Sequence, residues 1–266
     1  MTTVPVTRPR PSRLSMAAFD SLDMADRNLR SLLRTPAQLV FATVQPIIFV
    51  LLFRYAFGGA IHVPGTSYVD YLMPGIFAQA VAFGALGTAV GLAYDLKTGL
   101  LERFRTLPMS RLAILAGRTL ADLVRNVAVV AVMAGVGFAV GFRIRTSAEG
   151  FLAALALATF FAFALSWGFV ALGLAIKDPE AAQGAGVPIM FLLVFSSAAF
   201  VPLSTMPGWL QAIGARQPVT ALVNAERALI LGGPAASPVM YTVAWSAGLL
   251  VGFAALATLV YQSMGR

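Results

Sequence analysis

FLAALALATFFAFALSWGFVALGLAI, residues 151–176, runs through the middle of the chain without a single charged side chain. A helix needs about 20 mostly apolar residues to cross roughly 30 Å of hydrocarbon, and this stretch exceeds that length. The whole chain has 266 residues, of which 59% are hydrophobic and 11% charged, whereas soluble domains carry roughly 25% charged residues. We therefore expect lipid to be the solvent for much of the molecule.

Working outward from this stretch, the sequence predicts an all-α, polytopic membrane protein with six transmembrane helices. Each span is an apolar run, and the runs are separated by polar or proline-containing connections. The first has a kink expected at Gln45-Pro46. The expected spans are Leu39–Phe57, Leu72–Tyr94, Leu120–Phe142, Phe151–Ile176, Gly184–Val201 and Tyr241–Tyr261.

The remaining segments divide the chain further. Residues 1–14 are predicted to be a disordered basic tail, residues 15–36 an amphipathic helix on the cytoplasmic membrane surface, and residues 37–266 the six-helix domain. Two short helices, Gly208–Ala215 and Thr220–Leu231, are expected on the external side before the last span. Both are too short to cross, so they either re-enter the outer leaflet or lie on the surface as a cap.

Basic residues are unevenly distributed between the connections. Fourteen of the 19 Lys and Arg residues fall on the side that holds both termini, and five on the other. The positive-inside rule then places both termini in the cytoplasm. The abundance of Arg and Ala fits a GC-rich bacterial genome, and we expect a multi-pass protein of the bacterial plasma membrane.

Composition also excludes several chemistries. There is no cysteine, and His62 is the only histidine, so neither a thiolate nor a multi-histidine metal site is expected. No Gly-Lys-Ser or Gly-Lys-Thr occurs, so the chain lacks the Walker A loop that cradles a nucleotide, and no catalytic residue is predicted. The net charge of +8 reflects topology rather than nucleic-acid binding.

The central thirds of the six predicted spans contain no ionisable residue. Ion-coupled carriers usually need such a residue near the middle of the membrane, and charged filters need rings of them. An energy source outside the chain, such as a partner ATPase, is therefore favoured. Two alternatives stay open at this point: an ion-coupled carrier or channel that acts alone, and a non-transporting membrane scaffold.

The most informative connection is the predicted cytoplasmic loop KTGLLERFRTLPMSR, residues 97–111. Leu100, Leu101 and Phe104 share one face of a short helix that Pro108 ends. Such a helix either rests on the inner leaflet or inserts its apolar anchors into a groove on a partner protein. The residue pattern alone does not favour one of these over the other.

This loop resembles a signature of the type-2 ABC exporter permeases, in which Gly99, Glu102-Arg103, Arg105, Pro108 and Ser110-Arg111 match the pattern. Arg34-Thr-Pro36, Gln217-Pro218-Val-Thr220 and Glu226-Arg227 extend the similarity to the daunorubicin-resistance branch, over roughly residues 20–260.

The resemblance implies several roles that the pattern of residues does not establish. The loop helix would dock on a separate ATPase subunit, which would bind ATP and Mg²⁺ in place of this chain, and the helix over residues 15–36 would touch the same subunit. A second permease, identical or different, would pair with this one, with spans one and five at the interface. The residues implied in ATPase docking are Leu100, Leu101, Glu102, Arg103, Phe104, Arg105, Leu107 and Pro108.

Phenylalanines concentrate in spans one and five and suggest a path for drug, lipid or glycolipid cargo: Phe41, Phe49, Phe53, Phe191, Phe195 and Phe200. An uncharged aromatic lining suits amphipathic molecules, although each ring could equally face lipid or pack on a neighbouring helix. The steps Gly87-x-x-x-Gly91 and Gly248-x-x-x-Gly252 predict close helix packing rather than a pore.

Overall fold

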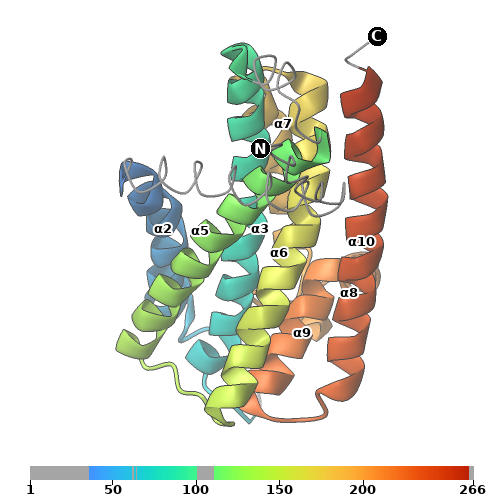
Figure 1. Ribbon diagram of the computed structural model, residues 1–266. Helices are drawn as coiled ribbons and strands as arrows, with labels where there is room; N and C mark the ends of the chain where they lie inside the picture. Colours follow the sequence, from blue (N-terminus) through green and yellow to red (C-terminus); the bar gives the residue numbers. More distant parts are fainter. Residues whose placement is uncertain (1–35, 62, 64, 101–110, 264–266) are drawn as a thin grey trace, which may run out of the picture.

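The computed structural model describes residues 36–61, 63, 65–100 and 111–263, with side chains from residue 43 onward and, after the gap, from residue 117. The predicted tail over residues 1–14 and almost all of the predicted helix over residues 15–36 lie outside these residues. Within them every regular element is helical (Figure 1).

The helices follow the expected order along the chain. They are α2 (Pro36–Leu51), the π-helical η1 (Leu52–Phe57), α3 (Tyr68–Lys97), α5 (Arg111–Ala139), α6 (Ala148–Ile176), α7 (Pro179–Phe195), the 3₁₀ turn η2 (Leu203–Thr205), α8 (Gly208–Arg216), α9 (Pro218–Leu231) and α10 (Ala236–Ser263).

Four helices are long and apolar enough to cross a membrane: α3, α6, α10 and, within α5, Gly117–Ala139. The other two expected spans correspond to shorter apolar helices, Thr43–Phe57 and Pro179–Phe195. The all-helical character is thus confirmed for the described residues, with several helices apolar enough to cross a membrane, whereas the count of six spans stays a prediction.

Polar side chains define where the long helices begin. Ser67 has an extended backbone and accepts a hydrogen bond from the Asp70 N–H at 3.2 Å, and Ser147 accepts one from the Gly150 N–H at 3.2 Å. Asp178 caps α7 in the same way, directly before Pro179 at the first helical position. Each capping oxygen satisfies a backbone donor that the first helical turn leaves free.

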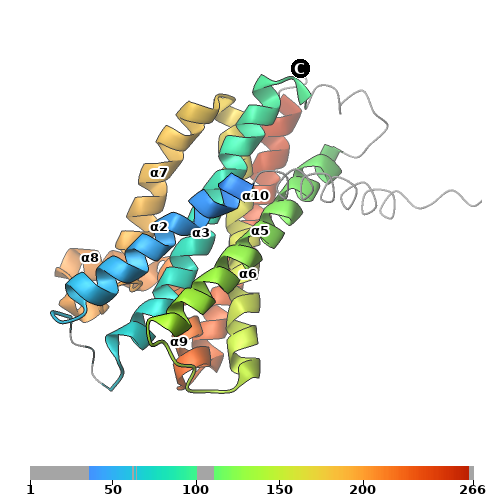
Figure 2. The same cartoon turned by 90° about the vertical axis from the view of Figure 1, so that its left-hand side faces the viewer.

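α3 is the central helix of the bundle, and α5, α6, α7, α9 and α2 surround it (Figures 1 and 2). In its most apolar stretch 72% of the residues are buried, compared with 11% in α10, which packs on α6 and α9 at the periphery. The main core therefore forms around α3, and most of α10 faces outward.

The fifth predicted span ends earlier than expected. The sequence pattern extends it to Val201, but α7 ends at Phe195 and the chain turns over Ser196–Val201. The Tyr68 hydroxyl donates to the Phe200 carbonyl at 3.1 Å, and the Thr220 hydroxyl accepts from the Ala198 N–H at 3.1 Å. These tertiary partners satisfy the backbone groups that a longer helix would have paired internally.

Gly75 of α3 lies directly against this turn. A methyl group at its Cβ position would lie 2.6 Å from the Ala199 carbonyl carbon, which is far inside van der Waals contact. Gly248 of α10 has open space around the same position, with nothing within 4 Å. The small residue at 248 thus makes no close packing against the described residues of this chain.

We predict opposite effects for the same substitution at these two glycines. Gly75→Ala should destabilise the protein by about 1–3 kcal/mol, because the backbone of the turn must shift to admit the methyl group. Gly248→Ala should leave stability unchanged or raise it by up to about 1 kcal/mol, because alanine favours the helix. Thermal unfolding of both variants in detergent measures the difference, and equal midpoints would contradict the close approach.

Candidate functional site

The predicted ATPase-docking segment falls almost wholly in the gap. Leu101, Glu102, Arg103, Phe104, Arg105, Leu107 and Pro108 lie outside the described residues, and only Leu100 is described, as a partly buried side chain. Its role in docking stays a prediction.

An ion pair holds the end of α3, where this segment begins, to the start of α7. The Lys97 Nζ lies 2.9 Å from the Asp178 Oδ2. The Asp178 carboxylate accepts a hydrogen bond from the Ala181 backbone N–H and another from Lys97. Both bonds hold the pKa of this carboxyl below its ordinary value, and the bond from Ala181 has the larger effect. Both side chains are well exposed, so this pair contributes little to the stability of the fold.

The predicted cargo-path phenylalanines do come together. Phe53 stacks on Phe200 with ring centroids 4.5 Å apart, and Phe195 lies 5.0 Å from Phe200 and 5.9 Å from Phe49. Phe191 stacks on Phe195 at 5.3 Å. Five of the six predicted rings thus form one cluster that joins α2 and η1 to α7 and the turn after it, and the side chain of Phe41 lies outside the described residues.

The cluster is partly open to the surroundings of the protein. Phe200 is 4% exposed, whereas Phe191 and Phe195 are 40% and 38% exposed. Aromatic contacts of this kind stabilise by roughly 0.5–1.5 kcal/mol beyond simple burial. The rings therefore serve as packing on one side and as an accessible apolar surface on the other.

A groove of about 640 Å³ adjoins this cluster and runs between α2, α3, α5 and α7. Its polar lining comprises Gln45, Gln79, Arg118, Arg125, Asn126 and Gln183, and its apolar lining includes Pro46, Phe83, Val187 and Phe191. Ring centroids of Phe83 and Phe191 lie 5.5 Å apart in an edge-to-face contact, which links the groove to the aromatic cluster.

Two carboxamides in the groove are buried without partners. Gln79 is 1% exposed, and neither its amide oxygen nor its amide nitrogen bonds to any described residue. Asn126 is 2% exposed and its amide nitrogen likewise lacks a partner among the described residues. An unsatisfied buried polar group costs about 1–3 kcal/mol, so these two side chains are unusual features of the fold.

Sequence reasoning missed these residues because it searched the spans only for charges. The available signal was an uncharged amide inside an otherwise apolar stretch, as at Gln79 and Gln45. Asn126 could have been found in the same way, next to Arg125 on α5.

Both arginines of the groove are neutralised by acids. Arg125 pairs with the Asp122 Oδ1 at 3.0 Å and donates to the Gly84 carbonyl at 2.7 Å, while Arg118 pairs with Asp95. The glycine step at Gly87 and Gly91, predicted to pack helix on helix, instead lies beneath these guanidinium groups. A side chain at either glycine would displace the arginine above it.

The opposite end of the bundle, which holds α9, contains a second polar cluster. The Arg227 guanidinium donates to the carbonyls of Tyr71, Ala198 and Ala199 at 3.1, 2.7 and 3.1 Å, and lies 3.4 Å from the centre of the Tyr71 ring. Asp70, 3% exposed, accepts from the Arg143 N–H at 2.9 Å and pairs with Arg145 at 2.8 Å. Together these contacts join α3, the α5–α6 loop, α9 and the turn after α7.

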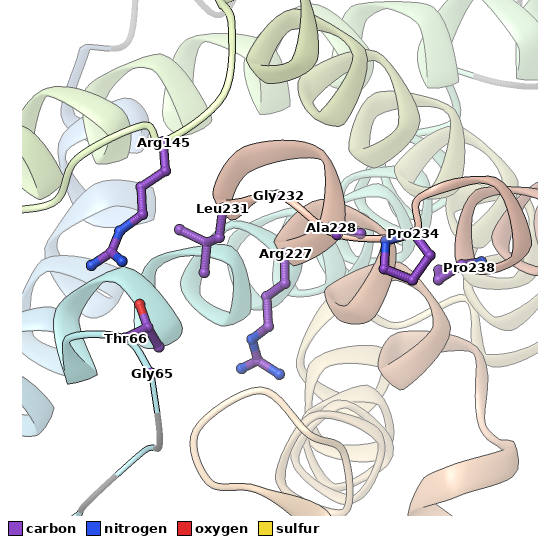
Figure 3. Close-up of a pocket in the computed structure, with 10 residues that line it drawn as sticks. Gly65, Thr66, Arg145, Arg227, Ala228, Leu231, Gly232, Pro234 and Pro238 are labelled. Atoms are coloured by element: carbon purple, nitrogen blue, oxygen red, sulfur yellow. The ribbon is translucent and has the colours of Figure 1, made fainter.

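A pocket of about 410 Å³ opens beside this cluster (Figure 3). Arg145 enters it from the α5–α6 loop and Arg227 from α9, while Pro234 and Pro238 line the side away from Arg145 (Figure 3). Both guanidinium groups already bind acceptors of the protein itself, so the contacts of this pocket are chiefly structural.

Glu226, the neighbour of Arg227, is fully buried, and neither carboxyl oxygen bonds to a described residue. α9 is outside the spanning helices, and burial raises the pKa of this carboxyl well above its ordinary value, with the nearby Arg227 opposing the shift. Burial therefore favours the protonated form of Glu226, because an unpaired buried carboxylate is far less stable than the neutral acid.

The fold is that of a helical protein with several helices long and apolar enough to cross a membrane. A family model described as ABC-2 type transporter matches residues 23–231, and the chain belongs to that family.

Similar proteins include a daunorubicin resistance ABC transporter permease from Streptomyces coeruleorubidus, 35% identical over 96% of this chain and 89% of its own length. A probable doxorubicin resistance ABC transporter permease from Mycobacterium tuberculosis is 29% identical over 80% of this chain and 77% of its own. A putative transport permease from Cyanophora paradoxa is 27% identical over 74% of this chain and 69% of its own.

Glu226 generates a prediction with a defined pH dependence. Above pH 4.5, the ordinary pKa of a glutamate, the unfolded chain releases the carboxyl proton of Glu226 while the folded protein keeps it. Rising pH therefore favours unfolding. Glu226→Gln removes this effect. The variant should match the wild type near pH 4.5 and unfold at least about 2 °C higher at pH 8, the shift that about 1 kcal/mol produces in a chain of this size.

Thermal unfolding in detergent across this pH range measures the effect, with Glu149→Gln, at an exposed position in α6, as the control. A Glu226→Gln variant that is less stable than the wild type at pH 8 would show that the carboxyl is ionised and paired in the folded protein.

Proposed function

We propose that this chain is the membrane-spanning permease subunit of an ABC exporter that moves a hydrophobic or amphipathic molecule outward. The observation that carries the proposal is membership of the ABC-2 transporter family, with drug-resistance permeases among the relatives. The aromatic cluster supports the choice of cargo, because its rings offer an uncharged, partly accessible apolar surface.

ATP hydrolysis is assigned to a separate subunit that binds ATP and Mg²⁺. The segment over residues 100–108 is its docking element, and the segment over residues 15–36 is a second contact. Both then face the cytoplasm together with the two termini, in the plasma membrane of a bacterium. The uneven distribution of basic residues supports this orientation.

Two permeases, identical or different, pair around the cargo path, and bilayer lipid surrounds the pair. The exposed apolar side chains of α2, η1 and α7 support an interface there: Ile48, Leu52, Tyr55, Ile189 and Leu192 are between 44% and 72% exposed. α8 and α9 form the external connection before the last span.

The docking role is tested by co-purification. The double variant Glu102→Ala/Phe104→Ala should lose most of the ATPase that co-purifies with the wild-type chain. It removes one apolar and one charged side chain from the proposed docking segment. The matched control is Phe138→Ala/Glu149→Ala, which alters two exposed residues at the opposite end of the bundle. Normal ATPase recovery with the first variant would refute the docking assignment.

The chain has no cysteine, so single-cysteine variants test the pairing without further changes. Cysteine at Leu192 of α7 or Leu52 of η1 should give cross-linked dimers in native membranes with a short bifunctional thiol reagent. Cysteine at Val251 or Leu259 of α10 should give few, although these side chains are 72% and 64% exposed. Equal cross-linking at both faces would contradict an interface at α7 and η1.

A further inference from the structure

The groove between α2, α3, α5 and α7 has the chemistry of a binding site for one part of a cargo molecule. It is formed within a single chain and holds about 640 Å³, which is within the size range of small-molecule sites. Four carboxamides line it, and two of them, Gln79 and Asn126, are buried without partners among the described residues.

The groove does not present a free charge. Arg125 is bound to Asp122 and to the Gly84 carbonyl, and Arg118 is bound to Asp95. An anionic headgroup would have to compete with these acids, and a cationic one would meet two guanidinium groups. A neutral group meets neither obstacle.

Carboxamides both donate and accept hydrogen bonds, so they pair with hydroxyl, carbonyl and amide groups of a ligand. Phe83 and Phe191 form the adjoining apolar wall, and Phe191 stacks on Phe195 of the aromatic cluster. A molecule with its polar part against Gln79 could therefore extend its apolar part along the phenylalanines.

The glycines of α3 keep this space open. Side chains at Gly84, Gly87 or Gly91 would collide with Asn126, Arg125 and Arg118 respectively. Because these three positions lack a Cβ, the polar side chains of α5 approach α3 closely where both helices line the groove.

We propose that this groove binds the uncharged, hydroxyl- or carbonyl-bearing part of an amphipathic cargo, with Gln79 and Asn126 as its hydrogen-bonding partners and Phe83 and Phe191 as its apolar wall. The assignment rests on the proposed export function and specifies the chemical class of its cargo.

Photolabelling of the full chain in phosphatidylcholine nanodiscs tests this assignment. Three probes carry the same diazirine-bearing alkyl chain and differ in headgroup: glucoside, phosphate or trimethylammonium. The glucoside should label the wild type saturably, and because its diazirine is on the alkyl chain, mass spectrometry should map the label to the apolar wall of the groove, around Phe83 of α3 and residues 187–191 of α7. Unlabelled alkyl glucoside should compete for this labelling, and the two charged compounds should compete at least about tenfold less well.

The double variant Gln79→Leu/Asn126→Leu should weaken glucoside binding about tenfold or more, since two hydrogen bonds to the headgroup are lost. The matched control is Gln211→Leu/Asn224→Leu, which makes the same replacements at exposed positions of α8 and α9. Thermal unfolding shows whether the variants fold. If the Leu variant unfolds early, Gln79→Met/Asn126→Met replaces it, with the same expectation.

Unchanged glucoside binding in the folded variant, label outside the groove, or preference for the phosphate or trimethylammonium compound would each overturn the assignment. Failure of the proposed function has a different signature. If no ATPase co-purifies but the glucoside binds through Gln79 and Asn126, the export function fails and the groove assignment stands.

Discussion

The hydrogen bonds of the partly buried Arg227 guanidinium are the contacts on which the arrangement of this end of the bundle depends. A cation that is partly removed from water needs hydrogen-bond acceptors around it, and here the acceptors come from the start of α3 and from the turn after α7. Its position on α9 thus connects three segments that are distant in the sequence. The turn it binds also places Phe200 against Phe53, so the aromatic cluster depends on the same contact.

The long helices could be predicted from sequence because lipid imposes a simple requirement on them. A span must be apolar over about 20 residues, and α3, α5, α6 and α10 all meet that condition near the expected positions. The short helices α8 and α9 were also found, since prolines and glycines mark their ends. The end of α7 was misplaced because apolarity continues to Val201, whereas the turn is determined by Tyr68, Thr220 and Arg227 from elsewhere in the chain.

The sequence predicted the aromatic cluster of the candidate site but not the groove beside it. Counting phenylalanines in two spans identified rings that do form one cluster, because residues on facing helices with the same apolar character tend to meet. The groove could not be predicted in that way. Its two central amides lie on α3 and α5, and nothing in either helix alone indicates that Gln79 and Asn126 line the same space. The pairing of Arg118 with Asp95 depends on tertiary contact between α5 and α3, whereas Arg125 and Asp122 are three residues apart on α5.

The central position of α3 also has a consequence for how the protein is made. Chains fold as they emerge from the ribosome, so α3 follows α2 and precedes α5, α6 and α7, which later enclose it. Until they do, the surface of α3 lacks those neighbours. An uncharged amide such as Gln79 costs less free energy in an apolar environment than a carboxylate would. The acids of α3, Asp70 and Asp95, lie near its two ends. The order of synthesis thus limits the polarity that the middle of the central helix can carry, whatever the finished bundle would accommodate.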